Sequence, residues 1–369
     1  MEAWQSRMDG IIDAHVHMGS LTDAAHVNNI LEAVRLEKMG LVSIQDPAHG
    51  SGLPQSLYMK GRYPGTFYVF AGLNHGQQLS GGRVTAPSLV AQVESFRKMG
   101  CDGIKMIEGK PTSRQTLDIP VTDTYFADYW ARVEDLGVPL VWHVGDPEEF
   151  WNPEQLPEWA RKRGWGYSAA DVQKEELYAE VDEVLARHPN LRIIFAHFYF
   201  LSADLARAAR FFDAHPHIYF DLTPGIEMLY NLSRDAQTTR DFFLKYADRI
   251  VFGTDISSRN AVTEAVFRAG IIFRWLESDA TFRVPDGVDV LLGKPEDGII
   301  RGLSLPDAVL ERIYRLNYTR LVGAKPRSLS LSHAIAECTR IGSIARRLSG
   351  MPAEDTEAVR VARKLEVLS

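Results

Sequence analysis

The chain of 369 residues has only two cysteines, no cluster of basic residues and no apolar run long enough to cross a membrane. Cys101 and Cys338 stand far apart and outside any motif spacing, which argues against a disulfide framework and favours a reducing, cytoplasmic setting. The net charge is −7, so nucleic acid is not an expected partner. The acidic N-terminus leads almost directly into an apolar run and does not have the form of a signal peptide.

What the chain does have is a hydrophobic fraction of 45%, enough for a large buried core. Short apolar runs rich in β-branched residues alternate with segments of helical periodicity. The expected strands are 11–19, 41–44, 67–73, 103–107, 138–144, 193–197, 218–221 and 250–255. A helix is expected over 22–39, with Gly40 as its stop, and further helix-ending glycines are Gly100 and Gly137.

Eight strand–helix units predict an α/β fold, a (β/α)₈ TIM barrel over residues 9–325, with the active site at the carboxyl ends of its strands. A doubly wound open sheet is the alternative, but no Gly-rich nucleotide fingerprint follows the first strand. Residues 326–369 are expected as a C-terminal helical extension with amphipathic helices over 332–349 and 354–368. These helices are interpreted as a docked appendage or as the surface of a homo-oligomer.

Two other segments stand out from the regular units. Residues 279–302 are punctuated by glycine and proline and are interpreted as a small hairpin insertion. Residues 145–172 form a long loop after the fifth strand, and long loops on the active face of a barrel are usually functional. The aromatic residues of this loop either wall a substrate pocket or pack the loop itself; they are Trp151, Trp159, Trp165 and Tyr167.

The motif Asp13-Ala14-His15-Val16-His17 lies in the first expected strand. Side chains alternate along a strand, so Asp13, His15 and His17 are expected on one face. Hydrogen-bonded core histidines are the alternative to a metal site. The metal reading is preferred because two neighbouring imidazoles are costly to bury without a shared partner.

Other expected strands also end in residues that bind metals or move protons. His143, His197 and Asp255 close the fifth, sixth and eighth strands, and Lys105 is expected to point into the barrel from the fourth. Each has an ordinary explanation, such as a structural histidine or a helix-capping aspartate. Together they predict a catalytic site at one end of the barrel. Asn74, Gln45 and Asp146 at other strand ends are expected to contact substrate or to support the site.

These motifs resemble the amidohydrolase superfamily. The N-terminal Asp13–His17 motif, Gly103-Ile104-Lys105 and the segment Asp248–Asp255 are similar to its amidohydrolase-2 branch, which includes aminocarboxymuconate-semialdehyde decarboxylase. The closing helix over 305–321, with Asn317, also resembles that branch. The resemblance covers about residues 9–323. One departure is Phe198-Tyr199-Phe200 after His197, where many relatives have a Gly-rich turn.

The resemblance implies one zinc ion per chain, held by His15, His17, His143 and Asp255. In such mononuclear members His197 is free to act with Asp255 in catalysis. In binuclear relatives a carboxylated lysine, here Lys105, bridges two metals and the strand-six histidine becomes a ligand.

The expected activity is hydrolysis of a small-molecule amide, ester or lactone by a metal-activated water. Zinc-dependent, non-oxidative decarboxylation of a small carboxylic acid is the alternative, and a metal-free lactonase or binding barrel is a third reading. Lys105, Arg259 and Asn74 are the expected substrate-binding residues, although a surface salt bridge is an equal explanation for Arg259.

Overall fold

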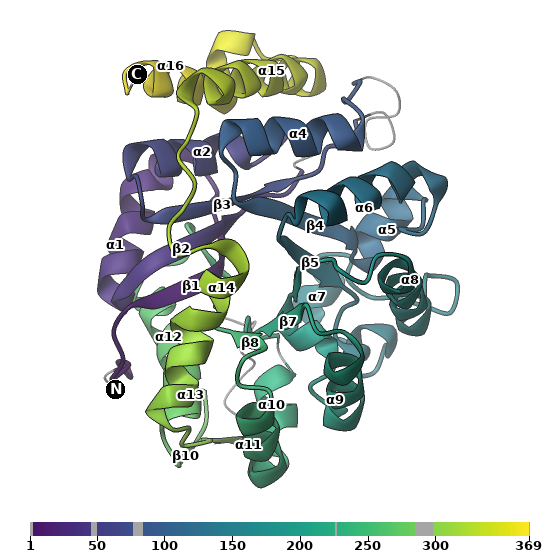
Figure 1. Cartoon of the computed structure of the whole chain (residues 1–369), viewed down its shortest axis with the longest axis vertical. Helices are drawn as coiled ribbons and strands as arrows, with labels where there is room; N and C mark the ends of the chain where they lie inside the picture. The colour runs from purple at the N-terminus through teal and green to yellow at the C-terminus, as the bar shows by residue number, and fades with distance from the viewer. Residues whose placement is uncertain (1–2, 46–49, 77–83, 226, 285–297, 369) are drawn as a thin grey trace.

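The computed structural model describes residues 3–45, 50–76, 84–225, 227–284 and 298–368. Parallel strands form a ring with the helices outside it (Figure 1). The strands are β1 (Ile11–His17), β2 (Leu36–Val42), β3 (Phe67–Gly72), β4 (Gly103–Gly109), β5 (Leu140–Val144), β6 (Ile193–Phe195), β7 (Ile218–Asp221), β8 (Ile250–Val251) and β9 (Ile256–Ser257). Each pairs with its neighbour in chain order, and β9 pairs back onto β1.

The barrel closes through an eighth strand that is broken into two short halves. β8 pairs with β7, and β9 pairs with β1. Across the break, the Ala14 amide donates to the Phe252 carbonyl (2.9 Å) and the Asp255 amide donates to the His15 carbonyl (3.0 Å). The predicted (β/α)₈ barrel is therefore confirmed.

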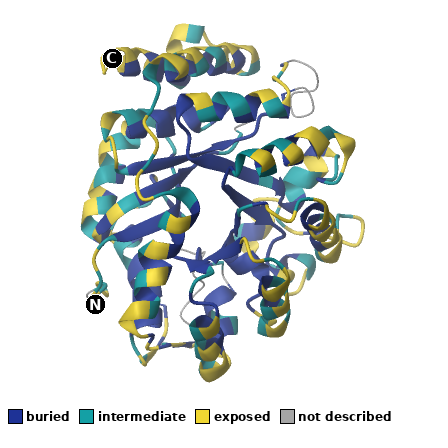
Figure 2. Ribbon diagram, viewed as in Figure 1, coloured by how far each residue is buried: buried dark blue, intermediate teal, exposed yellow. Residues whose placement is uncertain are grey.

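The helices bury one side against the strands or against neighbouring helices and expose the other (Figure 2). They are α1 (Ala24–Val34), α2 (Leu53–Arg62), α4 (Leu89–Met99), α5 (Pro111–Leu117), α6 (Thr124–Leu136), α7 (Glu158–Lys162), α8 (Lys174–Arg187), α9 (Leu205–Ala214), α10 (Met228–Ser233), α11 (Ala236–Lys245), α12 (Val262–Glu277), α13 (Asp307–Glu311), a π-helical turn (Arg312–Leu316), α14 (Asn317–Val322), α15 (Leu331–Ser349) and α16 (Glu357–Glu366). Within the described ranges, none combines the length and apolarity needed to span a bilayer.

The predicted helix over 22–39 is wrong beyond Val34. Arg35 adopts a left-handed conformation (φ 65°) that ends α1, and β2 begins at the next residue. Gly40 consequently lies inside β2 and not at a helix end. A Cβ there would lie 2.7 Å from both the Ala14 carbonyl and the Tyr318 hydroxyl, so close approach of the neighbouring backbone requires glycine. Gly100 and Gly137 do end helices, as predicted.

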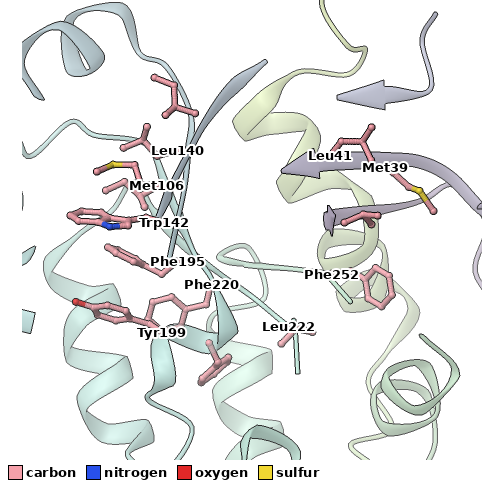
Figure 3. Packing of buried hydrophobic residues seen from close by; sticks show 14 of the residues in the cluster. Met39, Leu41, Met106, Leu140, Trp142, Phe195, Tyr199, Phe220, Leu222 and Phe252 are labelled. Carbon is pink, nitrogen blue, oxygen red and sulfur yellow. The ribbon is translucent and has the colours of Figure 1, made fainter. Parts of the chain in front are cut away.

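The apolar core has two layers. Outside the strands, large side chains such as Trp142, Phe195 and Phe220 pack against the helices (Figure 3). Inside the ring, a second cluster includes Phe70, and α14 adds Tyr318. The interior of the barrel is therefore filled, and space for ligands is left at the ends of the strands.

The C-terminal extension lies outside this ring. α15 and α16 pack against each other and against α2, and α15 also contacts α4 (Figure 1). Two short strands, β10 (Thr281–Phe282) and β11 (Ile300–Arg301), pair antiparallel, in agreement with the predicted hairpin. Residues 285–297 of that insertion lie outside the described residues.

The packing around Gly40 predicts a cost for any side chain there. We expect Gly40→Ala to lower the free energy of unfolding by about 1–3 kcal/mol, because the added methyl overlaps the β1 backbone. Gly52→Ala is the matched control, since the nearest atom to its new Cβ would be 3.8 Å away. Urea denaturation of both variants measures the difference; equal stability would contradict the close approach.

Candidate active site

Three predicted ligands meet at the carboxyl end of the barrel. His15 and His17 come from β1, and Asp255 comes from the turn between β8 and β9. The distance from Asp255 Oδ1 is 3.2 Å to His17 Nε2 and 3.8 Å to His15 Nε2. One ligand atom of each residue lies within 4.8 Å of the others, which is the spacing of groups that can share one metal ion.

Asp13 does not share the face of these histidines, which corrects that part of the motif prediction. Its carboxylate accepts hydrogen bonds from the Thr254 hydroxyl (2.6 Å) and the Thr254 amide (3.2 Å). The cause is an irregular register of β1 against β2 between Asp13 and Val16, which breaks the simple alternation. Asp13 therefore anchors the residue that precedes Asp255.

Asp221, at the end of β7, fixes the orientation of His15. Its Oδ2 lies 2.9 Å from His15 Nδ1, and both side chains are fully buried. The carboxylate accepts the Nδ1 proton, which leaves the lone pair on Nε2 facing Lys105 Nζ at 3.1 Å. The inward orientation predicted for Lys105 is thus observed, with the imidazole as its partner.

His197 and His143 form the other side of the site. Their rings are 4.8 Å apart, and the His197 ring is 5.8 Å from that of His15. His197 Nδ1 donates to the Thr223 carbonyl (3.3 Å), and His143 Nε2 donates to the Gly145 carbonyl (3.0 Å). His143 lies outside the three-residue ligand group, and its Nδ1 keeps the lone pair that a metal ligand needs.

The turn after His197 is left-handed although it contains no glycine. His197, Phe198, Tyr199 and Phe200 all have φ between 48° and 58°. Such a conformation costs roughly 1–2 kcal/mol for each L-residue. Aromatic packing offsets this cost: the Tyr199 ring stacks on Phe195 at 4.2 Å, and Phe200 stacks on His197 at 5.1 Å. The departure from a Gly-rich turn therefore places an aromatic wall beside His197.

The long loop after β5 is held by a buried polar cluster. Asp146 accepts two hydrogen bonds from Lys110 Nζ (2.7 and 2.9 Å) and one from the Tyr167 hydroxyl (2.5 Å). The Lys110 ammonium also lies 4.3 Å from the centre of the Trp165 ring. The aromatic residues of this loop gather around Phe150 as a small core of their own, so they pack the loop.

Three residues that were expected to contact the substrate have different surroundings. The Asn74 side chain is buried and supports the turn after β3, because its Oδ1 accepts from the Gly76 amide at 2.7 Å. Gln45 also contacts this turn, through the His75 amide. Arg259 is exposed and lies against Gly19, two residues beyond His17.

Burial and neighbouring charges set the protonation states of the site. Burial raises the pKa of Asp255, but the hydrogen bond from His17 and the nearby His15 outweigh it and hold that pKa well below its usual range. Burial, with the Lys105 ammonium, lowers the pKa of His15 to about 4. Burial also lowers the pKa of Lys105 to about 8 and that of His197 below its ordinary value. The site therefore holds the ionised Asp255 carboxylate beside neutral imidazoles of His15 and His197 near neutral pH.

Sequence reasoning missed the roles of Asp221 and Thr223. Asp221 orients His15, and its Oδ1 also accepts from the His197 amide at 2.8 Å. The available signal was an aspartate at the end of the seventh strand, in the same position as Asp255 in the eighth. Thr223 gave no such signal, because its contact with His197 arises only when the sixth and seventh strands pair.

Comparison with known proteins now identifies the family. A family model described as amidohydrolase matches residues 81–324, about two thirds of the chain. The chain belongs to the amidohydrolase family. The match includes His143, His197 and Asp255, whereas the β1 histidines precede it. Comparison with curated proteins gives no match.

Solved structures share the fold of this amidohydrolase at low identity. It is similar to 2,6-dihydroxybenzoate decarboxylase from Rhizobium, with 17% identity, a TM-score of 0.52, and coverage of 85% of this chain and 99% of the other. It is also similar to a putative amidohydrolase from Staphylococcus aureus, with 15% identity, a TM-score of 0.50, and coverage of 86% of this chain and 100% of the other. A TIM-barrel protein from Bordetella bronchiseptica, described as uncharacterised, has 15% identity and a TM-score of 0.50, with coverage of 88% of this chain and 99% of the other. At these identities the likeness shows the barrel alone.

A separate cavity lies behind Phe200 in this amidohydrolase. Its volume is about 460 Å³, and Lys174, Glu149 and Glu227 are among the residues that line it. Glu227 is buried, and neither of its carboxylate oxygens has a hydrogen-bond partner among the described residues. Burial raises the pKa of this carboxyl group to about 7.

This burial predicts a pH dependence of stability. The folded state holds the Glu227 proton more tightly than the unfolded state. The contribution of this carboxyl group to the free energy of unfolding is therefore fully present below about pH 4.5 and is lost as pH rises to about 7. We expect Glu227→Gln to raise the free energy of unfolding by about 1–3 kcal/mol at pH 8 and to change it little at pH 4.5. Denaturation at both pH values measures this, with exposed Glu154→Gln as control. An equal effect of Glu227→Gln at both pH values would contradict it.

Proposed function

We propose that this amidohydrolase is a metal-dependent hydrolase that acts on a small-molecule amide, ester or lactone. The observation that carries the proposal is the group His15, His17 and Asp255, whose ligand atoms lie within 4.8 Å of one another at the carboxyl end of the barrel. Two imidazoles and one carboxylate form a donor set typical of zinc. We therefore propose one zinc ion per chain, with His143 as the fourth ligand.

The residues present fit such an ion. Asp221 holds the His15 ring so that the Nε2 lone pair, and not a proton, faces Asp255 and Lys105. The Gly145 carbonyl accepts a hydrogen bond from His143 Nε2, which leaves the lone pair of that ring on Nδ1, where it can bind a metal. When bound, a zinc ion supplies Lewis acidity, which polarises a carbonyl group and lowers the pKa of water to about 7.

The proton chemistry is assigned to side chains of the chain itself. Asp255 is ionised, so it accepts a proton from the attacking water and returns it to the leaving group. His197 Nδ1 is occupied by Thr223, so its Nε2 accepts a hydrogen bond and orients the water. Lys105 is a donor beside His15 and stabilises negative charge as it develops on the substrate oxygen.

Decarboxylation of a small carboxylic acid is the second candidate, and Lys105 is the observation that favours it. Its buried ammonium has an imidazole, not a carboxylate, as its hydrogen-bond partner among the described residues, so it suits a substrate carboxylate. Zinc-loaded protein incubated with panels of amides, esters, lactones and carboxylic acids separates the two activities. Acid release from the first three classes supports hydrolysis, and CO₂ release from the fourth supports decarboxylation.

Removal of one ligand tests the metal assignment. We expect His15→Ala to lower the metal content per chain severalfold and to lower the melting temperature in zinc, because metal that binds only the folded state stabilises it. The control is His333→Ala on the exposed face of α15. Elemental analysis after purification without chelator gives the ratio. An unchanged ratio in His15→Ala would remove His15 from the ligand set.

The proton-transfer role of Asp255 is tested on the substrate that the panels identify. We expect Asp255→Asn to retain most of the bound metal and to lose at least about 100-fold in kcat, since an amide cannot accept the proton. Metal content and kcat are measured on the same preparation. Near-normal turnover would exclude Asp255 from the chemistry.

A further inference from the structure

One cavity is lined both by His17 of the candidate metal site and by residues of the C-terminal extension. Its volume is about 610 Å³, and it begins at His17 at the carboxyl end of β1. Part of its lining comes from the start of α16 and from the segment before it, including Met351, Asp355 and Arg360. The extension therefore lines a cavity that reaches His17.

Glu357 fixes this part of the cavity wall to the barrel. One of its carboxylate oxygens accepts from the Ser20 hydroxyl and the Leu21 amide, both at 2.7 Å. The other accepts from Gln55 Nε2 at 2.6 Å. Both oxygens of this carboxylate are thus engaged by the barrel, so α16 is held in place and Glu357 has little capacity left for other donors.

Two arginines line the same cavity, Arg259 from the turn after β9 and Arg360 from α16. Neither has a carboxylate within 4.0 Å in the part of the chain that the structure describes, although Asp355 and Glu357 lie on the same wall. The surface salt bridge considered for Arg259 is therefore not seen there. Arg259 Nε lies only 3.0 Å from the position of a Cβ on Gly19, which places it close to the β1 end.

We propose that this cavity binds an anionic group of the substrate between Arg259 and Arg360, so that the C-terminal extension supplies a specificity-determining residue. Guanidinium groups bind carboxylates through paired, charge-assisted hydrogen bonds. The preferred substrates are then small molecules with two anionic or polar ends, one at the metal site and a carboxylate at the arginines. This inference rests on the proposed function, because it takes the His17 end of the cavity as the reaction site.

The experiment compares ligands that differ only in the second charge. Isothermal titration calorimetry on the zinc-loaded full chain measures the affinities of linear dicarboxylates, from succinate to suberate, and of the monocarboxylates of equal length. We expect at least one dicarboxylate to bind about tenfold or more tightly than its monocarboxylate, as hydrogen bonds between charged partners allow. Arg360→Gln should remove most of that preference and leave the zinc content unchanged.

Arg363→Gln is the matched control, since it removes the same charge from α16 but lies outside the cavity. Arg259→Gln should reduce the preference as Arg360→Gln does. Absence of a dicarboxylate preference in the wild-type chain, or its persistence in Arg360→Gln, would overturn the inference while leaving the metal site intact. Failure of the wild-type chain to bind zinc would instead overturn the proposed function.

Discussion

The pairing of β1 with the broken eighth strand is the constraint on which the site depends. The Asp255 amide bonds to the His15 carbonyl, and β9 continues the pairing beyond His17. Asp13 adds a side-chain contact to Thr254 across the same junction. Closure of the barrel therefore also brings the three candidate ligands together, because both depend on the pairing of β1 with the broken eighth strand.

Burial gives the polar groups of the site their chemical states. A buried imidazole resists protonation, and a buried carboxylate stays ionised only where donors surround it. Asp255 meets this condition through His17, and Asp221 through His15 and Thr223. The result is that neutral nitrogen donors of His15 and His143 lie on the same face of the barrel as the charged carboxylate of Asp255, and a divalent metal binds such groups. The same physics raises the pKa of Glu227, which is buried and has no side-chain hydrogen-bond donor beside it among the described residues.

The structure also ties the C-terminal extension to the barrel next to the candidate site. α15 and α16 pack on the outer helices, but Glu357 reaches the loop after β1 and the start of α2. The barrel supplies the shared chemistry of the family, and the added helices supply one wall of a cavity beside it.

The sequence alone determined the architecture and most of the candidate site, because short apolar strands and helix-ending glycines are local signals. The periodicity located eight strand units, and His15, His17, His197 and Asp255 lie in or shortly after the carboxyl-terminal halves of their strands, close to the expected strand ends. The start of β2 was missed because Arg35, an ordinary helix former, adopts a left-handed conformation that no local pattern shows.

Only the tertiary structure decided which of those residues meet and what orients them. The separation of Asp13 from the histidines depends on a register shift against β2, and the Asp221–His15 bond joins residues 206 positions apart. The left-handed turn at Phe198 and Tyr199 is stable only because aromatic side chains from several elements pack around it. Contacts between distant segments have no local sequence signature, since they arise from the closure of the barrel as a whole.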